Sequence, residues 1–214
     1  MPKTFPTPNC SEQPSREELE RARRWREALE KAHVPKRHWD FDKPTGSEWT
    51  AKLARLAPQI GSGTLVALIG PRGTGKTQLA VELIRRHVAD SDKPWPVYAR
   101  AIEIFMWLRE SFGPANRTEA EAVRAFTAPK LLVIDEAHER GGSDWENRLL
   151  TYIIDVRYAE MRDTILVSNE TLAGFKAAIG SSIYSRLTET GGVIVCDWPS
   201  FRIPPAQAAR MARA

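Results

Sequence analysis

From about residue 64 onward, short apolar runs alternate with longer helical stretches. Short runs rich in β-branched side chains predict buried strands. They fall at 64–69, 96–99, 130–134, 164–167 and 193–196. The stretches between them predict helices, among them 76–88, 102–111 and 143–158. Strands that alternate with helices favour an α/β fold with a mainly parallel sheet covered on both faces.

Two capping boxes mark further helix starts. In such a box a Ser or Thr hydroxyl accepts from an early amide, and a Glu three residues later reaches back to the cap. Ser15 with Glu18 predicts a helix over about 16–32, and Thr118 with Glu121 opens another helix. The charges of the first helix suggest a solvated or partner-facing element. The residues before it, 1–14, contain four prolines and are expected to form a mobile arm.

Composition adds little about partners. There are 31 basic and 27 acidic residues, a formal charge of +4, which is compatible with nucleic-acid binding but does not require it. Two cysteines, Cys10 and Cys196, cannot build a disulfide framework or a zinc cluster by themselves. No apolar run reaches the roughly 20 residues of a membrane span. We therefore expect a cytoplasmic protein.

A phosphate-binding loop is predicted at Gly70–Thr77, GPRGTGKT. It fits the pattern GxxxxGK[ST] and lies between a predicted strand and a predicted helix. Lys76 would contact the β and γ phosphates of ATP, and the Thr77 hydroxyl would bind Mg²⁺. The alternative is a Gly-rich turn without a ligand. The residues expected to contact the nucleotide are Gly70, Pro71, Arg72, Gly73, Thr74, Gly75, Lys76, Thr77 and Gln78.

An acidic pair, Asp135 and Glu136, follows the predicted strand 130–134. Strand ends often carry acids that only face solvent, so this signal is weak alone. It becomes strong about sixty residues after a phosphate-binding loop. Asp135 would hold hydrated Mg²⁺, and Glu136 would orient and polarise the attacking water.

Asn169 follows the predicted strand 164–167. Its amide is placed to hydrogen-bond the γ-phosphate or the water. The alternative is a turn or cap residue, which Asn often is after a strand.

Together, GPRGTGKT (70–77), LLVIDEAHE (131–139), ILVSNE (165–170) and SRL (185–187) resemble the AAA+ ATPases of the DnaC-type helicase loader and IstB-type transposition helper family. The resemblance covers about 33–202. It implies a three-layer P-loop sandwich with a mainly parallel five-stranded sheet. It also implies ATP hydrolysis with Mg²⁺, nucleotide-dependent self-association, and a replicative helicase or a transposase as partner.

Two arginines acquire roles only through this resemblance. Arg186, in SRL, matches the arginine finger that reaches the γ-phosphate of a neighbouring subunit. Arg202 matches a second sensor arginine that acts in its own subunit. Read from the sequence alone, either one is equally an ordinary surface side chain.

The family also binds single-stranded DNA, and Phe112 and Trp145 match positions that contact it. Aromatic faces flanked by arginines suit base stacking with phosphate contact. The alternative is that both rings pack in the core. The flanking arginines are Arg109, Arg117, Arg140 and Arg148.

The resemblance divides the chain into three parts: an arm with a partner-binding helix (1–32), the ATPase domain (33–202) and a tail (203–214). The tail is too short for a full helical lid, and 1–32 is shorter than the helicase-binding domain usual in bacterial loaders. The leading hypothesis is an ATP-dependent helicase loader, and the runner-up is a transposase regulator. A small-molecule kinase is a remote alternative, because such kinases need an Arg-rich lid and an acceptor pocket.

Overall fold

One sheet organises the protein. The computed structural model describes residues 15–40, 48–89, 95–111, 118–139 and 141–202. Its strands lie in the order β2-β3-β4-β1-β5, and every adjacent pair is parallel. The predicted five-stranded parallel sheet is therefore confirmed. The strands are β1 (Leu65–Ile69), β2 (Val97–Arg100), β3 (Leu131–Asp135), β4 (Asp163–Ser168) and β5 (Gly192–Val195).

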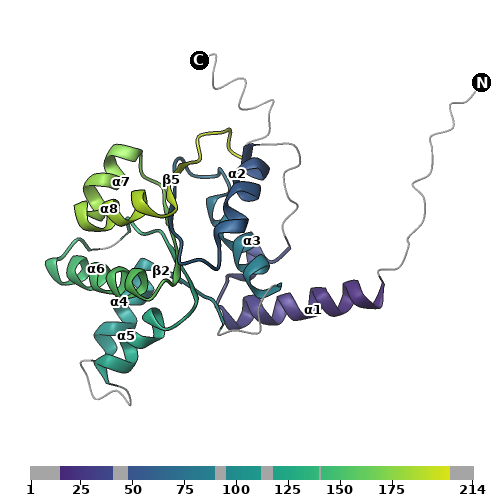
Figure 1. Ribbon diagram of the computed structural model, residues 1–214, viewed down its shortest axis with the longest axis horizontal. Coiled ribbons are helices and arrows are strands. Elements are labelled where there is room, and N and C mark those ends of the chain that lie inside the picture. The colour runs from purple at the N-terminus through teal and green to yellow at the C-terminus, as the bar shows by residue number, and fades with distance from the viewer. Residues whose placement is uncertain (1–14, 41–47, 90–94, 112–117, 140, 203–214) are drawn as a thin grey trace, which may run out of the picture.

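Helices cover both faces of this sheet and make the predicted three layers (Figure 1). Alternate residues of β1 point to opposite faces, as the period of a strand requires. Val66 and Leu68 join the core under the first three helices, whereas Ala67 and Ile69 join the core under the later ones. The first set is α1 (Arg16–Lys31), α2 (Glu48–Leu56) and α3 (Lys76–Ala89). The second set is α4 (Ala101–Glu110), α5 (Glu119–Thr127), α6 (Asp144–Ala159), α7 (Leu172–Ile179) and α8 (Ser181–Glu189).

The predicted capping box of α5 is confirmed. The Glu121 amide donates to Thr118 Oγ1 at 3.2 Å, and the Glu121 carboxylate accepts from the Thr118 amide at 2.8 Å. At the start of α1 the Leu19 amide donates to the Ser15 carbonyl at 3.0 Å. The Glu18 side chain lies outside the described part of the chain, so that box remains a prediction.

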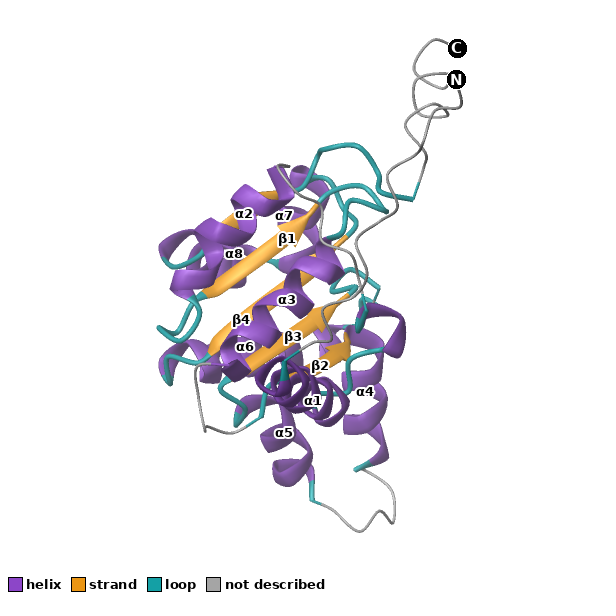
Figure 2. Cartoon of the chain, turned by 90° about the vertical axis from the view of Figure 1, so that its right-hand side faces the viewer, coloured by secondary structure: helices purple, strands orange, loops and turns teal. Residues whose placement is uncertain are grey.

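Helix α1 extends along the α3 side of the molecule with its first turns pointing away from the body (Figures 1 and 2). Only its C-terminal half is anchored, through buried Ala28 and Leu29. Near its start Leu19 is 56% exposed. The predicted solvated helix is thus present, and the arm 1–14 before it falls outside the described residues.

A buried arginine lies at the edge of the sheet where β3 and β4 begin. Arg157 of α6 is fully buried and donates to the carbonyls of Phe126 at 2.9 Å and Pro129 at 2.8 Å. It also donates to the Asp163 carbonyl and to Thr164 Oγ1 at the start of β4. One guanidinium therefore joins α6, the end of α5 and β4.

Several expectations fall on residues that the structure does not describe. These include Phe112, Arg117, Arg140 and the tail 203–214. Within the described ranges, no helix is long and apolar enough to cross a bilayer.

Candidate functional site

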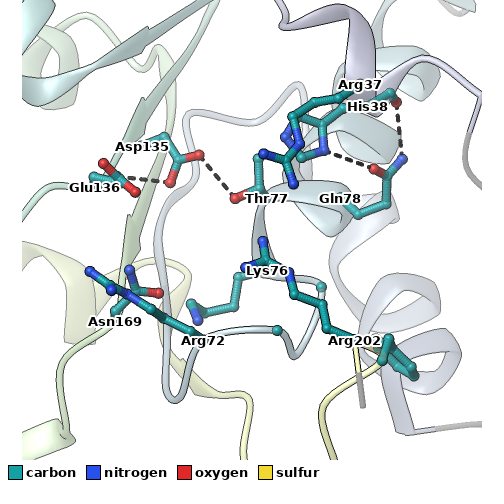
Figure 3. A pocket seen from close by; sticks show the side chains of 13 residues that line it. Arg37, His38, Arg72, Lys76, Thr77, Gln78, Asp135, Glu136, Asn169 and Arg202 are labelled. Atoms are coloured by element: carbon teal, nitrogen blue, oxygen red, sulfur yellow. Dashed lines mark hydrogen bonds between the residues drawn. The ribbon is translucent and has the colours of Figure 1, made fainter. Parts of the chain in front are cut away.

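A cavity of about 540 Å³ opens beside the phosphate-binding loop and the carboxyl ends of β3 and β4. It brings together Lys76, Thr77, the acidic pair Asp135 and Glu136, and Asn169 (Figure 3). Ligands bind at this edge in open α/β sheets. The residues singled out from three separate motifs thus line one cavity.

The loop needs its glycines for two reasons. Gly70, Gly73 and Gly75 have φ angles of 132°, 88° and 77°, a region that residues with a Cβ rarely adopt. In addition, a Cβ at Gly70 would lie 2.5 Å from the Cys196 carbonyl oxygen, and one at Gly73 would collide with Ser200. The segment after β5 therefore closes tightly against the loop.

Two tryptophans hold the carbonyls of this loop. Trp198 Nε1 donates to the Thr74 carbonyl at 2.8 Å, and Trp49 Nε1 donates to the Gly75 carbonyl at 3.1 Å. The Phe201 amide donates to the Gly73 carbonyl at 2.9 Å. These bonds fix the loop to α2 on one side and to the segment after β5 on the other.

Lys76 is 4% exposed, and its ammonium donates to the carbonyls of Gly70 at 2.8 Å and Pro71 at 2.7 Å. Both acceptors are uncharged. Burial lowers the pKa of Lys76, because desolvation disfavours the charged form. A phosphate in the cavity would supply the negative charge that these carbonyls lack, so the site fits a nucleotide.

The Mg²⁺ expected with ATP also fits. Thr77 Oγ1 donates to Asp135 Oδ2 at 2.9 Å, so the two expected ligand oxygens face the same point (Figure 3). The Tyr98 hydroxyl donates to the same carboxylate, and burial together with Asp135 raises the pKa of Tyr98. No group of three or more His, Cys, Asp or Glu in the described chain could hold a metal. Mg²⁺ usually takes one or two protein ligands plus substrate phosphates, and here Thr77 and Asp135 would be those ligands.

Glu136 has a strained backbone, with φ at 51°. A non-glycine residue in this region costs free energy and often marks a functional site. A hydrogen bond with the Glu139 carboxyl, together with burial and nearby negative charge, raises the pKa of Glu136. Glu139 in turn pairs with Arg72 of the phosphate-binding loop at 3.3 Å. The proposed water-orienting carboxylate is thus linked to the loop through Glu139.

Asn169 lines the same cavity from the end of β4. Its backbone amide donates to His138 Nδ1 at 3.4 Å. Contact of its side-chain amide with the γ-phosphate or the attacking water remains a prediction.

The two arginines lie in different places. Arg202 lines the cavity of its own chain, with its amide donating to Ser200 Oγ at 3.2 Å. Arg186 is not among the described residues that line the cavity; it lies on α8, 3.2 Å from Asp155 Oδ1. The position of Arg202 places it beside the nucleotide cavity of its own chain, and the roles of both arginines remain predictions.

Trp145 is half-buried at the start of α6. Its ring meets Phe105 edge-on, with centroids 6.1 Å apart, and the Arg109 guanidinium lies 5.3 Å above it. Arg109 also donates to the buried Glu146 carboxylate at 2.8 Å. Packing against Phe105 therefore accounts for the partial burial of the Trp145 ring, and stacking of this ring on a base remains a prediction.

Arg37 and His38 also line the cavity, although the sequence reading did not single them out. They lie in the short 3-10 helix η1 (Lys36–His38). His38 Nδ1 lies 3.2 Å from Gln78 Oε1, while Gln78 Nε2 donates to the His38 carbonyl at 3.2 Å. Burial lowers the pKa of His38. The only sequence signal for Arg37 and His38 was that they lie within the range, about 33–202, over which the chain resembles the helicase loader and transposition helper family.

Several known proteins are similar to this chain in sequence or in fold. Protein YdaV of Escherichia coli K12, whose function is uncharacterised, is 28% identical over 69% of this chain and 59% of its own length. The replicative helicase loader DnaC of the same strain is 22% identical over 70% of this chain and 61% of its own. This chain thus spans about three fifths of these curated relatives. A crystal structure of the DnaC helicase loader superposes with a TM-score of 0.62 at 20% identity, covering 75% of this chain and 99% of that one.

The fold is therefore that of AAA+ P-loop proteins, as the resemblance implied. Residues 11–204, most of the chain, match the family described as IstB-like ATP binding protein. The chain belongs to the family of IstB-like ATP-binding proteins.

Proposed function

We propose that this protein is a Mg²⁺-dependent ATPase that self-associates, binds single-stranded DNA and loads a replicative helicase. The observation that carries the ATPase proposal is the convergence of Lys76, Thr77, Asp135 and Glu136 on one cavity. The loading role rests on the helicase loader DnaC among the relatives.

The cavity residues that come from the three motifs have roles in this proposal. Lys76 binds the β and γ phosphates, and the Gly70–Thr77 loop supplies its amides to them. Thr77 and Asp135 would hold Mg²⁺, which offsets phosphate charge when bound. Glu136, once deprotonated, orients the attacking water, and Asn169 positions that water or the γ-phosphate.

The site is completed by a second copy of the chain. Arg202 lies at the cavity of its own subunit, whereas Arg186 lies on α8 outside it. An arginine supplied by a neighbour stabilises the charge that develops on the transferred phosphoryl group. Hydrolysis is therefore slow in the monomer and rises with assembly.

Single-stranded DNA binding is proposed for the surface where α4 ends and α6 begins. The Arg109 guanidinium over the Trp145 ring offers both a phosphate contact and an aromatic neighbour. Arg109 is held by Glu146 and its side chain remains 56% exposed. Phe112 belongs to the same proposal.

The test is ATP hydrolysis by purified protein, measured with single-stranded DNA, with duplex DNA and without DNA, while oligomer mass is followed in the same samples. We expect assembly in ATP and faster hydrolysis with single-stranded DNA. An added replicative helicase should enter an ATP-dependent complex. ATP binding without hydrolysis or assembly would contradict the proposal, and phosphate transfer to a metabolite would favour a kinase.

The family itself supports a second candidate, an ATPase that regulates a transposase, because the matching family is described as IstB-like. The catalytic cavity would be the same, and the DNA substrate would differ. Wrapping of duplex DNA by the ATP-bound protein would favour this candidate. Preference for single strands and a helicase complex would favour the loader.

Glu139→Gln is expected to shift the acidic limb of the pH profile of kcat/KM to lower pH. The hydrogen bond and charge of Glu139 raise the pKa of Glu136, so wild-type activity is lost on acidification at a pH above the ordinary range of Glu. Removing the charge lowers that pKa, and Glu136 then stays deprotonated to lower pH.

ATP ionises identically in assays of wild type and of Glu139→Gln. A difference between their two pH profiles therefore comes from groups of the protein. The matched control is Glu119→Gln on the exposed surface of α5, which should leave the limb in place. An unmoved limb in Glu139→Gln would show that Glu139 does not control Glu136.

A further inference from the structure

We propose that Asp155 and Ser182 hold Arg186 in a resting position within its own subunit, and that Arg186 must leave them to reach the nucleotide of a neighbour. This inference rests on the proposed function, in which Arg186 acts between subunits. It makes Asp155 a positioning residue that controls how readily a second copy activates hydrolysis.

Arg186 contacts residues of two helices, α6 and α8. Its guanidinium folds back along α8 and donates to the Ser182 carbonyl at 3.0 Å and to Ser182 Oγ. It also lies 3.2 Å from Asp155 Oδ1 on α6. The Tyr158 ring lies 5.5 Å from the guanidinium carbon. Two helices therefore share in holding this side chain.

This resting position leaves polar atoms on both sides of the ion pair without a hydrogen bond. Arg186 Nε and Asp155 Oδ1 are buried and have no hydrogen-bond partner within the described residues. A guanidinium offers five N–H donors, and a buried donor without an acceptor is costly. The side chain is also 26% exposed, and that of Asp155 is 39% exposed. The contacts that hold Arg186 therefore leave a buried donor unpaired and are partly exposed to solvent, so they should be weak enough to break.

The resting and active positions exclude each other. Arg186 Nη1 donates to Ser182, and Nη2 lies beside Asp155 Oδ1 as an ion pair without a hydrogen bond. A neighbour's phosphate that binds the forked end of the guanidinium would need these same two nitrogens. Binding to a neighbour's nucleotide must therefore break these bonds. Arg186 is then in equilibrium between the resting position and a released one. The smaller the released fraction, the weaker the apparent affinity of one subunit for the nucleotide site of its neighbour.

Releasing Arg186 should not detach α8 from α6. The Tyr158 hydroxyl donates to Glu189 Oε1 of α8 at 2.7 Å, independently of Asp155. Ile183 and Leu187 of α8 are also buried in the core. The isosteric Asp155→Asn variant is therefore expected to fold.

The test uses two full-length proteins that are each inactive. Lys76→Ala cannot bind nucleotide but donates Arg186, whereas Arg186→Ala binds nucleotide but donates no arginine. Their mixture should hydrolyse ATP. With Asp155→Asn added to the Lys76→Ala donor alone, the donor concentration for half-maximal hydrolysis should fall about two- to fivefold, the range of a partly exposed ion pair. The plateau rate should not change.

Three donor variants sharpen the result. Ser182→Ala should shift the concentration in the same direction by less, because the Ser182 carbonyl remains. Asp155→Glu keeps the charge and should stay near the unmodified donor. Glu160→Gln removes a charge from the end of α6 where the carboxylate lies 3.8 Å from Arg162, and should have no effect.

An unchanged or higher half-maximal concentration with Asp155→Asn would overturn the restraint. So would a lower plateau rate, because Asp155 would then help to place Arg186 for catalysis. If the unmodified mixture gives no hydrolysis while wild type does, the proposed action of Arg186 between subunits fails, and this inference fails with it.

Discussion

Glu136→Gln is expected to lower kcat for ATP hydrolysis by about 10²–10⁴-fold, the usual contribution of a general base. Gln keeps the size of the side chain but cannot accept the proton of the attacking water. The groups expected to bind nucleotide, Lys76 and the loop, are untouched. ATP affinity should therefore stay within a few-fold of wild type, and the ATP-bound assembly should persist.

Two measurements separate these effects. Single-turnover hydrolysis reports the chemical step, and binding of a fluorescent ATP analogue reports affinity. The matched control is Glu170→Gln, which changes a carboxylate just after β4 that does not line the cavity. Turnover of Glu136→Gln at the wild-type rate would assign the water-orienting role to another group.

Arg157→Met is expected to lower the free energy of unfolding by about 3–5 kcal/mol, because each buried carbonyl left without a donor costs about 1–3 kcal/mol. That is large beside a typical total of about 5–15 kcal/mol. Burial lowers the pKa of the guanidinium, so keeping it charged already opposes folding. Its hydrogen bonds offset that cost. Met fills similar space but leaves the carbonyls of Phe126, Pro129 and Asp163 without this donor.

Urea unfolding monitored by tryptophan fluorescence measures the change. Arg148→Met is the control on the same helix; its side chain is exposed, and we expect a change within about 0.5 kcal/mol. If Arg157→Met cost less than about 1 kcal/mol, water or a shifted backbone would have to satisfy those carbonyls. Arg157→Lys, which keeps a charge but fewer donors, should fall between wild type and Arg157→Met.

The sheet could be predicted because parallel strands are buried on both faces and read as apolar runs. All residues of β1, β3 and β4 are buried, and the predicted ranges differ from the observed ones by one residue at one or both ends. The prediction missed α2, although Trp49, Leu53 and Leu56 stand at helical spacing and are all buried. It also missed α7 and α8, which are short, although each buries one pair of apolar side chains four residues apart, Phe175 with Ile179 and Ile183 with Leu187.

The cavity was predicted where its residues are neighbours in the sequence, as in the phosphate-binding loop. The motifs also predicted that Lys76, Asp135 and Asn169 serve one site, but the contacts of residues outside the motifs were not visible. Gln78 meets His38 across 40 positions, and Tyr98 meets Asp135 across 37. Such pairs depend on how helices and strands pack, which no local pattern encodes. The positive φ of Glu136 likewise arises from the surroundings rather than from its residue type.

The bond from Trp198 to the Thr74 carbonyl spans 124 positions. A chain is synthesised from its N-terminus, so the phosphate-binding loop emerges from the ribosome well before the segment that closes on it. β5, which precedes that segment, pairs only with β1 in the described sheet and joins it late. A nascent chain paused before Trp198 has the loop sequence but lacks the bonds that shape it. The final shape of the nucleotide-binding loop therefore depends on a segment that is synthesised more than a hundred residues after it.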